Sequence, residues 1–192
     1  FDYFRDQNTM FEAFKKGLVD VFLESDPTRW ATGYDFPAMT AGEIVREEVE
    51  TATPRGMFAF VFNTRREIFA ERKVREAIGY LFDFEWINQN LLHGLYDRTT
   101  SYFANSELAS TGRPASEAER KMLAPFPGAV RADVMEGAWR PPVSDGSGRD
   151  RTMIRKALAL FREAGWTIRD GRLVDVDGDP MRFEILVATR PD

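Results

Sequence analysis

The residues best suited to contact a ligand are aromatic and arginine side chains in segments without regular periodicity. Trp30 and Tyr34 lie in one such segment, and Arg98 and Tyr102 lie in another. Ligand clefts combine apolar and aromatic walls with a few placed polar groups, and an arginine can hold a carboxylate through two hydrogen bonds. We therefore expect these four residues to border one concave ligand-binding face. The alternative is that side chains such as Trp30 only anchor loops on the core.

An acidic run near the end of the chain could be considered for metal binding. Asp175, Asp177 and Asp179 are spaced like the start of a calcium-binding loop, but the required bidentate glutamate does not follow and Pro180 intervenes. The Asp-Gly pair at 177–178 is also a favoured hairpin turn, which explains the same residues by backbone geometry. We expect no metal at this position.

Few residues could support catalysis. The chain has one histidine, His93, and no cysteine, so neither a familiar zinc site nor a Cys-His dyad can form. The position of His93 before Gly94 favours a role at a helix C-terminus. The glycine-rich nucleotide-binding patterns and the G-x-S-x-G elbow are missing, and adjacent carboxylates such as Glu47 and Glu48 point apart. The sequence predicts a binding module that has no cofactor and is not an enzyme.

Composition narrows the partners further. The 192 residues include 26 Lys and Arg against 31 Asp and Glu, a formal net charge of -5. Nucleic acid is therefore an unexpected partner, because its phosphates attract basic surfaces. The longest apolar run, residues 57–62, is strand-sized and far shorter than the ~20 residues that span a bilayer. The chain starts at Phe1 and stops just after a strand-like run, so we expect it to be a piece of a longer protein.

The elements that must position these residues begin with helix and strand signals in alternation. A short helix is expected before Gly17, capped by Asn8 or Thr9. Its apolar face would be formed by Phe11, Phe14 and Leu18. Alternating apolar residues predict strands over 19–23 and 44–49. Residues 57–62 are apolar on both faces, which predicts the buried central strand of a sheet.

Helical periodicity is strongest in the middle and late parts of the chain. It predicts helices over residues 71–82, 84–93, 116–123 and 151–164, with Asp83 and Asp150 as N-caps. The residues expected to face the core are Val74, Ala77, Ile78, Leu81, Ile154, Leu158 and Phe161. Residues 95–114 predict a long ordered loop, and residues 125–149, rich in Pro and Gly, predict an irregular connector.

The last segment of the chain carries hairpin signals. Asp-Gly pairs at 170–171 and 177–178 separate three strand-like runs, residues 166–169, 172–176 and 181–187, so an antiparallel meander is expected. Together the elements predict a single mixed α/β (α+β) lobe over residues 1–192. Its mixed sheet would be flanked by helices and would end in an antiparallel hairpin.

Several stretches of the sequence form a recognisable pattern: FVFNTRR (60–66), VREAI (74–78), FDFEWIN (82–88), YFRD (3–6), WATGY (30–34), FANSELA (103–109) and PPVSDG (141–146). They resemble the extracellular solute-binding proteins of family 5, and within that family the YejA-like oligopeptide and microcin C subgroup. In this family a buried strand ending in Phe-Asn runs into a helix and an Asp cap. One departure is Glu71, where the family helix usually has Asp.

The resemblance implies a two-lobed periplasmic receptor of the type II, cluster C-like class. Such a receptor binds oligopeptides or peptide-like solutes between its lobes and delivers them to the membrane permease of an ABC importer. This chain would be the interior of the C-terminal lobe, a monomer holding only part of the cleft. The alternative within the same fold is a peptide-sensing or chaperone-like binding protein.

Overall fold

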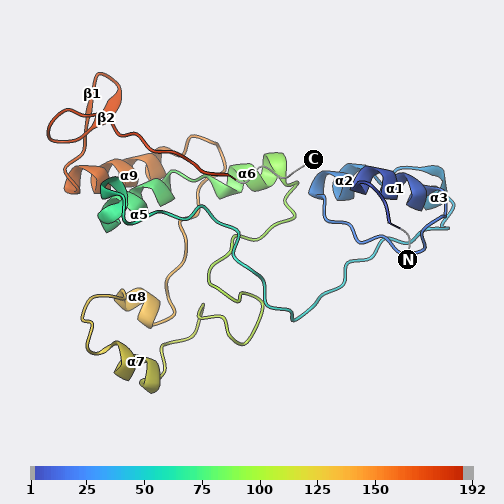
Figure 1. The fold of residues 1–192 in the computed structure, drawn as a ribbon, viewed down its shortest axis with the longest axis horizontal. Coiled ribbons are helices and arrows are strands. Elements are labelled where there is room, and N and C mark those ends of the chain that lie inside the picture. The colour runs from blue at the N-terminus through green and yellow to red at the C-terminus, as the bar shows by residue number, and fades with distance from the viewer. Residues whose placement is uncertain (1–2, 188–192) are drawn as a thin grey trace. The chain divides into compact units, whose positions relative to one another are not determined.

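The computed structural model describes residues 3–187. Contacts between residues divide the chain into two compact units. The first comprises residues 1–52 and 87–97, the second residues 53–86 and 98–192, and the division falls within helix α6 (Phe84–Leu91). Each unit is described by itself, and their elements are labelled in Figure 1.

The first unit is built on three short helices: α1 (Gln7–Lys15), α2 (Pro27–Thr32) and α3 (Pro37–Thr40). Helix α1 begins two or three residues earlier than the expected caps would place it, because the N-cap is Asp6, whose carboxylate accepts a hydrogen bond from the Thr9 amide at 2.8 Å. Phe11 and Phe14 are buried, as expected. Leu18 is not, because α1 ends at Lys15 and Gly17 turns the chain at a φ of +70°.

The sequence predicts two strands in this unit, and both predictions are wrong. Residues 19–23 and 44–49 form no strand, and Val21, Leu23, Val45 and Val49 are exposed. Alternation of apolar residues predicts which side of a strand would be buried, but a strand also needs a neighbour for its backbone hydrogen bonds. Within this unit the described residues form no such neighbour.

The second unit is centred on two helices that lie side by side, α5 (Arg72–Tyr80) and α9 (Arg151–Glu163) (Figure 1). The core between them consists of Val74, Ala77, Ala157 and Phe161. Small alanines allow the two backbones to approach, and Phe161 then fills the space beside them. A salt bridge of 3.1 Å between Lys73 and Glu163 joins the same helices at the surface.

The helix predictions hold well, with corrections at the ends. Leu81 is exposed because α5 ends at Tyr80, and Ile154 is 38% exposed near the start of α9 although it lies on the same face as Phe161. Asp150 caps α9 as predicted, accepting hydrogen bonds from Thr152 and Met153. Ser116 and Glu119 form a reciprocal capping box at the start of α7 (Glu117–Leu123). The remaining helices of this unit are α4 (Glu67–Ala70) and α8 (Ala132–Met135), the second lying inside the expected connector.

A hairpin follows α9, as the Asp-Gly pair predicts. Strands β1 (Thr167–Arg169) and β2 (Arg172–Val174) pair antiparallel, with Ile168 opposite Leu173. Asp170 and Gly171 both have positive φ, +50° and +73°, which is the backbone of a type I′ turn. The third strand of the expected meander is reduced to an isolated bridge between Val174 and Pro180, so the described residues form a two-stranded sheet.

The largest correction concerns the predicted central strand. Residues 57–62 form no strand, and Phe58 is fully exposed at 103% while Val61 is 90% exposed. The nearest regular pairing is a single bridge between Arg55 and Ala104. An apolar run marks a segment that favours burial, but it cannot supply the strands on either side that a central strand requires.

Candidate functional site

Trp30 lies within helix α2. The Asp26 carboxylate starts this helix by accepting hydrogen bonds from the amides of Thr28 and Arg29 at 2.8 and 3.0 Å. The helix ends at Gly33, where a Cβ atom would lie 2.6 Å from Arg29 Cγ. The Trp30 side chain is half-buried, and the Arg46 guanidinium lies 4.5 Å from the centroid of its ring. Arg46 Nη1 also donates to the Trp30 carbonyl at 2.6 Å.

Tyr34 belongs to the same aromatic cluster. Its ring centroid lies 5.8 Å from that of Trp30 and 5.3 Å from that of Phe11, both in edge-to-face geometry. The hydroxyl donates to Glu24 Oε2 at 3.2 Å, and the same carboxylate oxygen receives Arg29 Nε at 3.2 Å. Burial and the Glu24 charge raise the pKa of Tyr34 to about 12. Tyr34 is thus a neutral side chain whose hydroxyl is held in place.

Arg98 and Tyr102 lie in the second unit. Arg98 is half-buried, its Nη1 donates to the Pro142 carbonyl, and its guanidinium lies 5.5 Å from the Phe82 ring centroid. Burial lowers the pKa of Arg98, and the nearby charge of Glu85 opposes this shift. Tyr102 is exposed, whereas Ser101 beside it is buried and donates to the Tyr102 carbonyl at 3.0 Å.

The backbone that follows Tyr102 is unusual. Phe103 and Asn105 have φ values of +55° and +66°, in the left-handed region that residues other than glycine seldom occupy. The segment is held by the Arg55 amide, which donates to the Ala104 carbonyl at 2.8 Å, and by Asn105 Nδ2, which donates to the Thr53 carbonyl at 3.3 Å. Residues kept in such conformations by their surroundings are frequent in ligand-binding segments.

The four expected ligand contacts thus form two pairs, Trp30 with Tyr34 in the first unit and Arg98 with Tyr102 in the second. Sequence reasoning overlooked the side chains that hold these pairs. Glu24 and Arg46 support the first pair, and Glu85 and Ser144 surround the segment that Arg98 contacts. Asp83 was identified only as a helix cap. No local pattern could have connected Ser144 with residues some 60 positions earlier.

The residues considered for metal chemistry have local structural roles. Asp175 Oδ1 accepts hydrogen bonds from the amides of Asp177 and Asp179 at 3.0 and 2.8 Å, within the turn itself. His93 lies in the turn two residues after the end of α6, with a φ of +55°, and its Nε2 lies 3.4 Å from Thr28 Oγ1. Across residues 3–187, no three side chains of the kinds that bind metals gather into a possible site.

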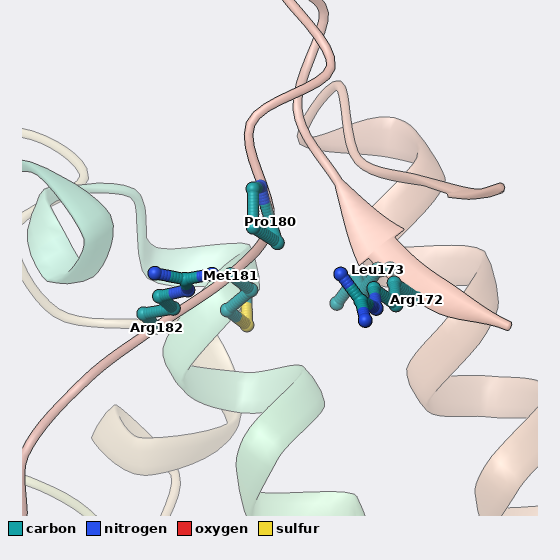
Figure 2. Close-up of a pocket in the computed structure, with 5 residues that line it drawn as sticks. All are labelled: Arg172, Leu173, Pro180, Met181 and Arg182. Carbon is teal, nitrogen blue, oxygen red and sulfur yellow. The ribbon is translucent and has the colours of Figure 1, made fainter. Parts of the chain in front are cut away.

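A cavity of about 350 Å³ lies beside the hairpin in the second unit. Figure 2 shows Arg182 and Met181 on one side of it and Arg172 and Leu173 on the other, with Pro180 between. Its charged groups are guanidinium groups, which can hold an anion but are poor proton acceptors. None of the four expected ligand contacts lines this cavity.

No helix in the described part of the chain is long and apolar enough to cross a membrane.

Comparison with known proteins decides the family. The model of the bacterial extracellular solute-binding proteins, family 5 middle region, matches residues 1–192. The chain belongs to this family. The match confirms the family resemblance, and this family implies a two-lobed binding-protein fold.

The relatives agree with this assignment. A Brucella melitensis protein with the provisional name of a binding protein is 52% identical over 191 residues and covers 100% of this chain. The peptidoglycan-binding protein YepA of Agrobacterium fabrum is 41% identical and covers 96%. YejA of the same organism, named a probable peptide-binding protein, is 39% identical and covers 97%. The chain spans 31% of the length of each of these relatives.

Proposed function

We propose that this chain is part of the periplasmic substrate-binding component of an ABC importer that captures oligopeptides or peptide-like solutes and passes them to a membrane permease. The chain would contribute to one lobe of a monomeric receptor, and it would have no catalytic role. The observation that carries the proposal is the family match over the whole chain, together with relatives named for binding peptides and peptidoglycan.

The side chains support a ligand of this class. Peptides and the stem peptides of peptidoglycan both offer carboxylates, backbone carbonyls and apolar side chains. Trp30 and Tyr34 provide aromatic surface, and Arg98 provides a half-buried cation able to bind an acidic or carbonyl oxygen. Tyr102, exposed beside strained backbone, adds a hydroxyl and a second aromatic ring. We propose that these four residues meet the ligand in the full-length receptor.

The test is a binding experiment on the full-length receptor. A mixture of tri- to pentapeptides and a mixture of peptidoglycan stem peptides are each incubated with it, and the retained molecules are identified by mass spectrometry and titrated by calorimetry. We expect saturable binding of peptides from at least one mixture. A folded receptor that retains no peptide from either mixture would contradict the proposal.

Arg98→Ala tests the site. If the guanidinium meets a ligand oxygen, its removal should weaken binding by about 1–3 kcal/mol, as expected for a charge-assisted hydrogen bond. The control is Arg155→Ala, because Arg155 is exposed on α9 and forms its hydrogen bonds within its own helix, to the Arg151 carbonyl and the Thr152 hydroxyl. Equal affinities for both variants, with circular dichroism unchanged, would remove Arg98 from the site.

A further inference from the structure

The hydroxyl of Ser144 lies against two carboxylates near the start of helix α6. It forms a short contact with Asp83 Oδ1 and lies 2.8 Å from Glu85 Oε2. The Ser144 amide donates to the same Glu85 oxygen at 2.9 Å. Ser144 is 61 and 59 residues from these partners along the chain. A single serine therefore fastens a distant loop to the first turn of α6.

The far end of this loop is held on the same helix. The Gly148 amide donates to Asp83 Oδ2 at 2.9 Å, while Asp83 Oδ1 caps α6 by accepting the Trp86 amide at 2.9 Å. Gly148 has a φ of +72°, and a Cβ atom there would lie 3.1 Å from Trp86 Cδ1. Only glycine fits this backbone comfortably against the indole ring. Residues 144–148 are thus fixed at both ends.

The near end of the loop leads to Arg98. Pro142, two residues before Ser144, offers its carbonyl to Arg98 Nη1. The guanidinium also lies over Phe82, the residue that precedes Asp83. The position of the Arg98 head group therefore depends on where the Pro142 carbonyl lies, and that depends on the anchoring of Ser144. Only Val143 separates Pro142 from Ser144, so a displacement at Ser144 reaches the Pro142 carbonyl over a short stretch of backbone.

We propose that Asp83, Glu85 and Ser144 are positioning residues that set the location of the Arg98 guanidinium through the Pro142 carbonyl. They thereby determine the affinity for the acidic or carbonyl group of the ligand. The proposal rests on the proposed function, in which Arg98 meets the peptide. An arginine side chain that is already held in its binding position loses less conformational freedom when the ligand binds than a mobile side chain does. This difference is the physical basis of the expected effect on affinity.

The first measurement is the affinity of Ser144 variants of the full-length receptor. The probe is a retained peptide with a free carboxylate from the mixtures above, compared with its C-terminal amide. Ser144→Ala should weaken binding about three- to ten-fold, the size expected for losing one or two hydrogen bonds that hold the loop. Ser144→Thr keeps the hydroxyl and should retain most of the affinity. The matched control is Ser147→Ala, because the Ser147 hydroxyl accepts only from the Arg149 amide within the loop.

A double-mutant cycle separates positioning from a general structural role. In the Arg98→Ala background, Ser144→Ala should cause no further loss of affinity, because the group that it positions is gone. An equal loss in both backgrounds would overturn the proposal, as would unchanged binding by Ser144→Ala when Arg98→Ala binds weakly. If Ser144→Ala fails to fold by circular dichroism, Glu85→Gln replaces it in the same cycle.

The failure of this inference and that of the proposed function are distinguishable. A wild-type receptor that binds no peptide contradicts the function, before any variant is made. A wild-type receptor that binds peptide, with additive losses in the cycle, contradicts only the positioning role of Ser144.

Discussion

The helix pair α5 and α9 and the extended segment 57–62 differ both in their apolar pattern and in their environment, because the segment is apolar throughout whereas each helix also carries charged residues. Val74, Ala77 and Phe161 are buried between the helices, whereas Phe58 and Val61 are almost fully exposed. A helix satisfies its own backbone hydrogen bonds and needs only one covered face. A central strand needs partners on both edges and cover on its faces. Apolar residues are therefore sufficient to predict the helix pair but not the strand.

The largest expected effect tests the helix side of this comparison. Phe161→Ala should destabilise the protein by about 3–5 kcal/mol, because the ring is 2% exposed and its removal leaves a cavity between α5 and α9. The measurement is urea unfolding followed by circular dichroism. Ile154→Ala is the comparison, because Ile154 lies two turns earlier on the same face of α9 but is 38% exposed, and its replacement should cost clearly less than that of Phe161. Equal costs would mean that the two positions do not differ in burial as described.

The elements that could be predicted depend on signals within a few residues. Asp83 and Asp150 were identified as caps because a carboxylate before an apolar periodic run has one favourable local arrangement. The Asp170-Gly171 turn is similar, since two positive φ angles suit those residues. The contacts of Ser144 with Glu85, and of Arg46 with Trp30, join residues far apart in the chain. No periodicity or local propensity encodes such pairs.

A second prediction tests the irregular region. Gly137 has a φ of +64°, and a Cβ atom there would lie 2.4–2.6 Å from the backbone of Arg113. Gly137→Ala should destabilise the protein by about 2 kcal/mol or more, because it combines an unfavourable φ with a clash against backbone atoms. Gly128 has a φ of +76° but open space around it, so Gly128→Ala should cost about 1 kcal/mol. Urea unfolding of both variants measures the difference, and equal costs would contradict the close approach.

A third prediction concerns pH. Burial opposes ionisation of Asp83, but hydrogen bonds from Ser144, Trp86 and Gly148 outweigh it and lower its pKa. A lowered pKa in the folded state stabilises the fold above the unfolded value of about 4, and this contribution is lost as the pH falls through the folded value. Asp83→Asn should therefore lower the midpoint of thermal unfolding at pH 7. It should also reduce the further loss of stability below about pH 4, and an unchanged acid slope would contradict this assignment.

The smallest expected effect tests the exposed side of the comparison. Phe58→Ala should change the free energy of unfolding by less than about 0.5 kcal/mol, because a fully exposed ring gives up little contact when it is removed. The measurement is the same urea unfolding used for Phe161→Ala, so the two phenylalanines are compared directly. Both changes remove the same atoms, and only their surroundings differ. If Phe58→Ala costs several kcal/mol, residues 57–62 are buried in the folded protein, and apolar content alone would then predict burial in both regions.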